Sequence, residues 1–481
     1  MSNTPGVEIK EITSLAASVA GVSTAVPAFI GHTELAPASV LNVPTKINSF
    51  SEYVETYGGP QKDELKVTLT ENANGISSVK TEIDKEAMHR MYYALKLYFS
   101  NGGGPCYILT VGDYNTNWDG AAYVEAPGTK FDAVVTDAGD KNQKTKFEDA
   151  IDVLEQYDEP TLIVMPDAAN GFGTASNYYS LVDRGLKQAS KLQDRFVIAD
   201  THAETAATVE AAAFDASSLK YGAIYHPYLE TTFEVSYDDS SVSMVHNGAA
   251  QTYDTKKLSD VLTGFATPTV TAANQALYAQ LKAQISAEIR VTIPSSGAIA
   301  GVYCKVDRER GVWKAPANVS LSDVIAPSDL ITAEAQSGLN IIASGRSVNV
   351  IRSFAGKGSV VWGARTLAGN DNEWKYVPVR RLYNYVEESV KNATEFVVFE
   401  PNTANTWVRT KTMVENFLTQ LWRDGGLAGA TPQDAYFVRI GLGETMTSQD
   451  ILEGRMNIEI GMAAVRPAEF IVLKFSHKLQ A

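Results

Sequence analysis

The sequence predicts a mixed α/β (α+β) fold. Three observations support this prediction. Helix-period and strand-period patterns alternate along residues 147–291, which is typical of helices packed on a mainly parallel sheet. Two stretches rich in Thr, Ser, Val and Asp, at 62–84 and 231–253, contain Asn-Gly turn pairs and indicate added β-hairpins. After residue 426 the chain ends in strand patterns.

The elements follow in order along the chain. Apolar and charged residues alternate over 7–12, which predicts an N-terminal arm with strand period and no hairpin partner nearby. A helix with one apolar face is expected over 86–100, followed by a strand over 106–111. In the alternating region we expect helices over 147–156, 176–193 and 204–214 and strands over 161–165, 195–199 and 221–225. The C-terminal part predicts helices over 379–390 and 403–422 and strands over 436–440 and within 455–475.

Composition excludes several classes of function. The 481 residues include 41 basic and 56 acidic side chains, which give a net charge of −15. Nucleic-acid binding needs clustered Lys and Arg to neutralise phosphates, so a DNA- or RNA-binding function is not expected. Cys106 and Cys304 lie in apolar contexts and are expected to be buried thiols, in keeping with a reducing cytoplasm. Residues 12–31 are too polar to span a membrane and lack a positive leader, so neither a span nor a signal peptide is expected.

Few motifs suggest chemistry. The glycine-rich stretches at 101–104 and 355–359 lack the order of a Walker A loop, so no nucleotide cofactor is expected. Asp200, His202 and Glu204 follow a predicted strand and are the candidate site of an α/β metal-dependent hydrolase. The alternative is that Thr201 or Asp200 caps the next helix. The charged run at 307–314 is a solvated loop, an anion site or a subunit contact.

Several segments together resemble contractile tail sheath proteins. The N-terminal matches are PGVEI at 5–9, GVSTAVPAFIG at 21–31 and NGG at 101–103. The longer matches are DRERGVWKAPAN at 307–318, VWGARTL at 361–367, VRRL at 379–382, FEPN at 399–402, GATP at 429–432 and PAEF at 467–470. On this ordered series the chain is identified as a member of the sheath family of phage tails, tailocins and phage-like contractile injection systems. Glu8 departs from the aromatic residue that many relatives carry there.

The resemblance implies a structural subunit that is not an enzyme and uses no cofactor. Such subunits polymerise as stacked rings around an inner tube in a metastable extended state, then contract and drive the tube through a target envelope. The implied partners are further copies of the chain, the tube protein, the baseplate and the tail terminator or cap, with no nucleic acid and no membrane insertion. Assembly is expected in the bacterial cytoplasm, as a virion or injection-particle component. The remaining alternative is another self-assembling tail or shell protein.

The resemblance also assigns domains and contact residues. Residues 1–35 and 300–481 are expected to form an inner, tube-facing, mesh-forming domain, with 36–299 as a peripheral α/β insertion. Strands donated between subunits would contain Val7, Glu8, Ile9, Ile12, Ile471 and Leu473. Candidates for contacts between subunits or structural salt bridges are Arg308, Arg310, Trp313, Arg365, Arg380 and Arg381. Asp450 and Glu453 are the candidates for facing the tube.

Overall fold

A computed structural model describes residues 19–72, 75–114, 137–171, 174–247, 256–263 and 272–470. The chain forms two compact units: a smaller unit of Met1–Val22 with Tyr385–Val465, and a larger unit of Ser23–Asn384 with Arg466–Ala481. Each unit is described by itself. The predicted strand-donating residues lie outside the described residues; these are Val7, Glu8, Ile9, Ile12, Ile471 and Leu473.

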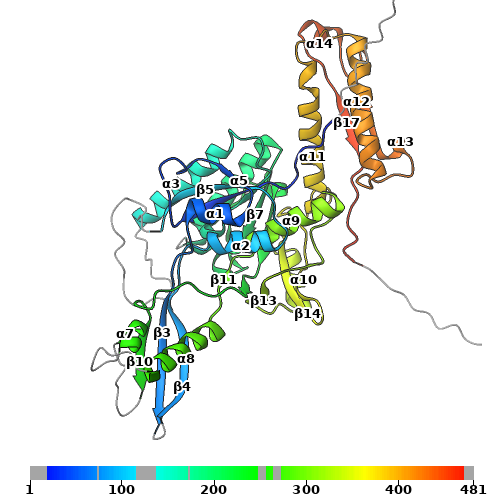
Figure 1. The fold of residues 1–481 in the computed structure, drawn as a ribbon. Helices are drawn as coiled ribbons and strands as arrows, with labels where there is room; N and C mark the ends of the chain where they lie inside the picture. The colour runs from blue at the N-terminus through cyan, green and yellow to red at the C-terminus, as the bar shows by residue number, and fades with distance from the viewer. Residues whose placement is uncertain are drawn as a thin grey trace, which may run out of the picture. The chain divides into compact units, whose positions relative to one another are not determined.

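The larger unit is built on a nine-stranded sheet with the order β12-β15-β14-β8-β7-β6-β1-β5-β2 (Figure 1). The central strands from β14 to β5 pair in parallel, which confirms the predicted α/β arrangement. Antiparallel strands complete both edges. The strands are β1 (Pro27–Thr33), β2 (Thr45–Ile47), β5 (Cys106–Asp113), β6 (Leu162–Val164), β7 (Phe196–Asp200), β8 (Gly222–His226), β12 (Val319–Ser320), β14 (Val348–Phe354) and β15 (Gly358–Val361).

Helices cover both faces of this sheet, and each face has its own apolar core. Helices α2 (Met91–Ser100) and α9 (Ser296–Arg310) contribute to one core, while α3 (Asp137–Leu154) and α5 (Ala175–Leu192) contribute to the other. Along β1, Phe29 belongs to the first core and its neighbours Ala28 and Ile30 to the second. Because both faces are buried, the strands read as continuous apolar runs instead of alternating ones. Both cysteines are buried here as free thiols, as expected.

A second sheet of the larger unit contains the predicted hairpin at 62–84. Strands β3 (Glu64–Asn72) and β4 (Gly75–Lys85) pair antiparallel, and α7 (Leu258–Thr263) and α8 (Ala272–Glu288) lie nearby (Figure 1). At the second predicted hairpin, β10 (Ser243–Asn247) pairs in parallel with β3, and Ser243 also forms an antiparallel bridge with Lys257. The predicted turn at 247–248 extends beyond the described residues. Met244 is buried in one core with Val67 and Leu69, so pairing with β3 buries an apolar side chain.

The helix predicted over 204–214 is wrong in its limits. A short turn η1 (His202–Glu204) and α6 (Thr208–Ala211) replace it, because Ala203 and Glu204 adopt left-handed φ angles of 44° and 58° that interrupt a right-handed helix. The small sheet β11-β9-β13 and four further helical segments complete the larger unit. These elements are β9 (Leu229–Thr231), β11 (Thr292–Ile293), β13 (Val324–Pro327), α1 (Phe50–Tyr57), α4 (Pro166–Gly171), η2 (Leu219–Tyr221) and α10 (Ala333–Asn340).

The smaller unit combines helices with a two-stranded sheet (Figure 1). Its long helices confirm the predicted ones and bury the expected stripe, which includes Val414, Leu418 and Leu421. Strands β16 and β17 pair antiparallel from Tyr436 opposite Met462 to Arg439 opposite Glu459. The elements are the last part of α11 (Val377–Thr394), η3 (Glu395–Val397), α12 (Ala404–Arg423), α13 (Pro432–Ala435), β16 (Tyr436–Arg439), α14 (Ser448–Leu452) and β17 (Glu459–Met462).

The limits of these units differ from the domain limits expected after residues 35 and 299. Strand β1 pairs with β5 and β6, so it is a central part of the sheet formed by the expected insertion. Strand β14 pairs with β8, and α9 contributes to the same core as α2, so residues 300–384 fold with that sheet as well. No helix among the described residues is long and apolar enough to cross a membrane.

Candidate functional site

Arg381 forms a buried ion pair in the larger unit. Its Nη1 and Nη2 lie 2.9 Å and 2.5 Å from the two carboxylate oxygens of Asp307 in α9. Only 3% of the Arg381 side chain and 5% of the Asp307 side chain are exposed. Nη2 also donates to the carbonyl of Thr24 at 2.9 Å, and the guanidinium lies 4.6 Å from the Tyr303 ring centroid. Arg381 therefore joins α11, α9 and the segment before β1 within one chain.

Arg380 occupies an aromatic pocket instead. Its guanidinium carbon lies 4.5 Å from the ring centroid of Trp374 and 4.9 Å from that of Tyr221. Its Nε donates to Oδ1 of Asn384, one helical turn later, at 2.7 Å. Cation–π contacts of this kind stabilise a desolvated cation. The buried position of Arg380 gives it a structural role inside the subunit.

Arg365 holds the returning C-terminal segment of the chain. Its Nε and Nη2 donate to Oε1 and Oε2 of Glu469 at 2.9 Å and 2.6 Å. Nη1 donates to the carbonyl of Asn340 at 3.1 Å, and the hydroxyl of Tyr376 donates to Glu469 at 3.2 Å. Two parallel hydrogen bonds fix the orientation of the Glu469 carboxylate relative to the Arg365 guanidinium as well as the distance between them. The segment after the smaller unit is thus clamped onto the larger unit immediately before residue 471.

The charged run at 307–314 begins as the last turn of α9, not as a loop. Arg308 and Arg310 are exposed in that turn, where basic side chains interact favourably with the helix dipole. Arg308 donates from Nη1 to the carbonyl of Gly102 at 3.2 Å. The helix ends at Gly311, whose φ is 89°, and the ring of Trp313 packs directly against this glycine. Arg308 and Arg310 thus remain at the surface, whereas Trp313 is half-buried.

Asp450 and Glu453 lie on and just after the short helix α14 in the smaller unit. The Asp450 carboxylate accepts from the backbone N–H and the hydroxyl of Thr447 at 2.8 Å and 2.7 Å, which completes a capping box. These hydrogen bonds, the backbone one first, lower the pKa of Asp450. Glu453 accepts from Gln449 at 2.8 Å and pairs with Arg455. Asp450 is therefore ionised at neutral pH, and both acids lie on an exposed segment.

The sheet of the smaller unit has only two strands among the described residues. Along β16 and β17 the ladder runs between these two strands, and Leu427 forms a single bridge with Ala464 just after β17. An isolated two-stranded hairpin is marginally stable, and an open edge is the usual acceptor for an added strand. Near this sheet's helices, the Val22 N–H donates to the hydroxyl of Ser389 at 3.2 Å, which fixes where the N-terminal segment leaves the unit.

Asp200, His202 and Glu204 do not form the predicted converging site. Oδ1 of Asp200 accepts from Ser295 Oγ at 3.1 Å and from the Ser296 N–H at 2.8 Å, so this carboxylate caps α9. Burial raises the pKa of Asp200 to about 6. The His202 side chain is also buried, but Glu204 is exposed. Among the described residues, three metal-ligand side chains come together elsewhere, at a cluster that sequence spacing did not indicate.

Comparison with known proteins places the chain in a family. Residues 369–478 match the family model of the phage tail sheath C-terminal domain. The chain is 31% identical to a subunit in the contracted helical sheath of the anti-feeding prophage, with a TM-score of 0.62 over 99% of this chain and 100% of that one. The chain belongs to the contractile tail sheath protein family. The hydrolase alternative is not supported, and the sheath family is one of structural subunits.

Two further relatives show how far the likeness to sheath proteins extends. The chain is 29% identical to a chain of the contracted PVC sheath complex of an extracellular contractile injection system, covering 99% of this chain and 98% of that one with a TM-score of 0.63. A tail sheath protein of Vibrio phage KVP40 is 25% identical over 190 residues, which are 38% of this chain and 26% of that relative. The chain thus matches injection-system sheath proteins over their full length, but only about a quarter of the phage protein.

Proposed function

We propose that this sheath protein polymerises as stacked rings around an inner tube in a metastable extended state, and that contraction of the rings drives the tube through a target envelope. The observation that carries this proposal is the full-length likeness to a subunit of a contracted helical sheath at 31% identity. Contraction would release free energy stored during assembly, as other kinetically trapped proteins do, without a nucleotide.

The two-stranded sheet of β16 and β17 supports a mesh of donated strands, because sheets of more than two strands are more stable. An arm containing Val7 and Ile9 from one neighbour and a strand containing Ile471 and Leu473 from another would extend this sheet. Each backbone hydrogen bond contributes roughly 1 kcal/mol net, so a donated strand of four to six residues contributes several kcal/mol. Links of that strength persist while the remaining contacts between subunits rearrange.

Both donated segments would leave the subunit from anchored positions. The N-terminal anchor is the Val22 to Ser389 hydrogen bond, beside the contact of Gly21 with the Tyr385 ring. The C-terminal anchor is the Arg365–Glu469 ion pair. Anchoring restricts the directions that a flexible strand can explore, and this lowers the entropy lost when it binds a neighbour.

Other surfaces are assigned within the same proposal. We place the mesh-forming, inner role in the smaller unit, which contains the tube-facing candidates Asp450 and Glu453, and a peripheral role in the β3-β4-β10 sheet of the larger unit. The exposed Arg308 and Arg310 are candidates for contacts between subunits. The tube protein, baseplate and terminator would be the other partners, with assembly in the bacterial cytoplasm.

Negative-stain microscopy of the purified chain tests assembly. Hollow, helical tubes are expected from the native chain, whereas Ile9→Pro should abolish them because proline cannot donate to a strand ladder. Ile9→Val is the matched control and should assemble normally. Tubes of normal length from Ile9→Pro would contradict strand donation, and a native chain that stays monomeric at high concentration would contradict the sheath function.

Tube contact is tested separately with charge-neutralising changes that keep hydrogen-bond acceptors. Asp450→Asn with Glu453→Gln should weaken co-sedimentation of sheath with tube, while the exposed Asp424→Asn at the end of α12 serves as the control. Equal tube binding by both variants would remove the two acids from the proposed tube-facing surface.

A further inference from the structure

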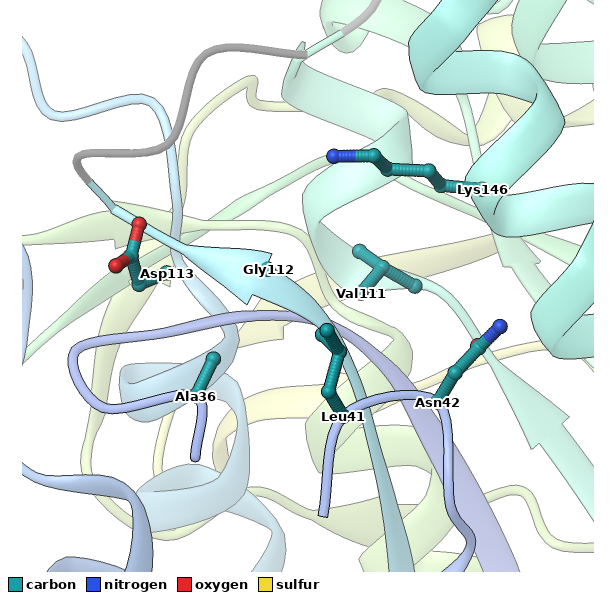
Figure 2. A pocket seen from close by; sticks show the side chains of 7 residues that line it. All are labelled: Ala36, Leu41, Asn42, Val111, Gly112, Asp113 and Lys146. Carbon is teal, nitrogen blue, oxygen red and sulfur yellow. The ribbon is translucent and has the colours of Figure 1, made fainter. Parts of the chain in front are cut away.

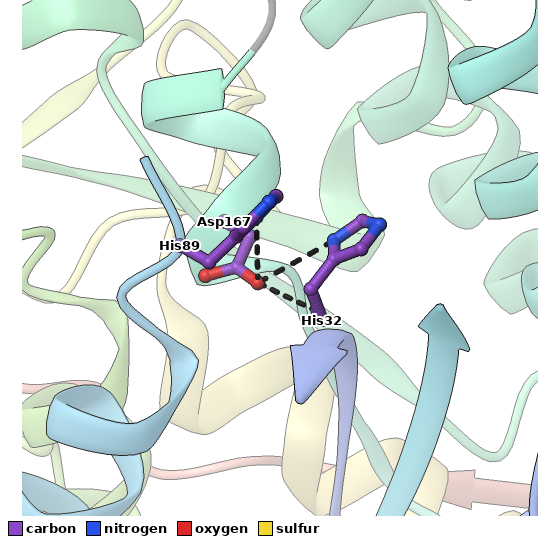
Figure 3. Close-up of side chains that lie close together, drawn as sticks. All are labelled: His32, His89 and Asp167. Atoms are coloured by element: carbon purple, nitrogen blue, oxygen red, sulfur yellow. Dashed lines mark hydrogen bonds and ion pairs between the residues drawn. The ribbon is translucent and has the colours of Figure 1, made fainter. Parts of the chain in front are cut away.

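A buried cluster of metal-ligand side chains lies in the larger unit, away from the surfaces assigned to assembly. His32 lies near the carboxyl end of β1, His89 in the segment before α2 and Asp167 in the first turn of α4, after β6 (Figure 3). One potential ligand atom from each residue lies within 4.8 Å of those of the other two. All three side chains are buried.

The position in the sheet is one where ligands bind in many α/β proteins. The chain passes from β1 to β5 on one side and later to β6 on the other, and all three strands are parallel. The strand order thus reverses at β1, and ligands bind preferentially outside the carboxyl ends of strands at such a point. His32 lies at one of these carboxyl ends and Asp167 follows another.

The geometry resembles a metal site before its ligands close on an ion. Oδ2 of Asp167 lies 3.8 Å from Nδ1 of His32 and 3.8 Å from Nδ1 of His89. Tetrahedral zinc with ligands at about 2.0–2.1 Å separates its ligand atoms by about 3.3 Å. Each of these two distances must therefore shorten by about half an ångström to fit a zinc ion. The ligand atoms of the two imidazoles lie within 4.8 Å of each other. The two imidazole rings stack with centroids 4.1 Å apart, so such movements shift side chains that already touch.

The cluster combines one carboxylate with two imidazoles, which are ligand types that zinc accepts. Burial is the main cause that lowers the pKa of both His32 and His89. The nearby guanidinium of Arg90 pairs with Asp63 and Glu86 at 2.9 Å and 3.0 Å, and its positive charge makes a smaller contribution to the lowered pKa of His89.

The Asp167 carboxylate is held rigidly by the backbone. It accepts from the N–H groups of His32, Arg90 and Met91 at 2.7 Å, 2.6 Å and 2.7 Å. These hydrogen bonds join β1 to the start of α2 through the Asp167 carboxylate and explain why a carboxylate is buried there. They do not use the two imidazole rings, whose placement around one carboxylate oxygen is what a metal ion requires.

A cavity of about 320 Å³ has a lining that includes Gly112, Asp113 and Lys146 (Figure 2). A Cβ added at Gly112 would lie 3.7 Å from Nε2 of His32, so this lining glycine packs close to the ring. The lining has one carboxylate, at Asp113, and one ammonium group, at Lys146, so its charges do not favour a cation over an anion.

We propose that His32, His89 and Asp167 bind a first-row transition-metal dication, with Zn²⁺ as the best match to two imidazoles and one carboxylate. Water would complete the coordination. The ion joins β1, the segment before α2 and α4, and so stabilises the sheet of the larger unit. This proposal does not depend on whether the chain assembles into a sheath.

Zinc binding is measured on the full-length, untagged chain after removal of metals with EDTA. Titration calorimetry should give one Zn²⁺ per chain, and zinc at 100 times its Kd should increase the folded-to-unfolded ratio about 100-fold. His89→Gln should weaken binding by at least tenfold, whereas His246→Gln, which changes a buried histidine in β10 outside the cluster, should leave it unchanged. Equal zinc affinity in the native chain and in His89→Gln would overturn the proposal.

A measurement on the native chain covers the case in which His89→Gln does not fold. X-ray absorption of the zinc-loaded protein detects scattering from whole imidazole rings. Two rings in the first coordination shell, at the Zn–N distance of about 2.0–2.1 Å, support the proposal. A shell of oxygen atoms with one ring or none shows an adventitious ion and overturns it.

Discussion

Replacement of Glu469 by Gln tests whether the C-terminal clamp controls assembly. The change removes the charge from a bidentate pair whose side chains are 8% exposed at Arg365 and 25% exposed at Glu469. A hydrogen bond to a charged group contributes roughly 1.5–3 kcal/mol, and solvent reduces this at the Glu469 side, so we estimate a loss of about 2 kcal/mol. Since 1.4 kcal/mol corresponds to a factor of ten, release of the segment should become about 30 times more frequent.

Hydrogen exchange and sedimentation measure the two consequences. Amides of residues 468–470 should exchange faster by about that factor in the unassembled chain, and the concentration needed for tube formation should rise. The matched control is Glu155→Gln, which removes an exposed pair with Lys191 and should change neither quantity. Unchanged exchange in Glu469→Gln would refute the clamp. Faster exchange with unchanged assembly would refute its role in strand donation.

Three further predictions concern single sites. Arg381→Met should lower stability by about 3–5 kcal/mol in urea unfolding, because Asp307 is left buried and unpaired, and adding Asp307→Leu should recover most of it; no recovery would argue against the pair. Burial raises the pKa of Asp200 to about 6, so the folded protein loses stability as the pH rises from about 4 through 6 and this buried carboxyl ionises. Asp200→Asn should remove about 3 kcal/mol of this pH dependence of the unfolding free energy. An unchanged pH profile would contradict this reasoning. Gly21→Val should push against Tyr385 and impair assembly in sedimentation, whereas normal tubes would show that the contact is dispensable.

Long periodic patterns predicted the core of the fold well. The strands β5 to β8 were visible because both sheet faces are covered, which makes each strand a continuous apolar run. Helix α12 could be predicted because Val414, Leu418 and Leu421 form an apolar stripe at helical spacing. Pairing between distant segments could not be predicted: β10 pairs in parallel with β3, far away in the sequence, and no turn pair can indicate such a partner.

The roles of the arginines could be predicted only in part. Their residue type indicated ion pairs, but only the structure shows that Arg381 is paired inside the subunit, that Arg380 is surrounded by aromatic rings and that Arg308 is exposed. The cluster of His32, His89 and Asp167 gave no sequence signal, because its members lie in separate segments that the sheet order brings together. The Asp200 cluster gave such a signal, yet its carboxylate caps a helix.

Cryo-electron microscopy of the assembled chain tests the central claim most directly. A helical reconstruction that resolves backbone density at β16 and β17 shows how many strands that sheet contains and to which subunits they belong. We expect additional strands, contributed by neighbouring subunits through residues near Ile9 and Leu473, beside β16 and β17. A sheet that stays two-stranded in the tube, or is extended only by its own chain, would contradict it.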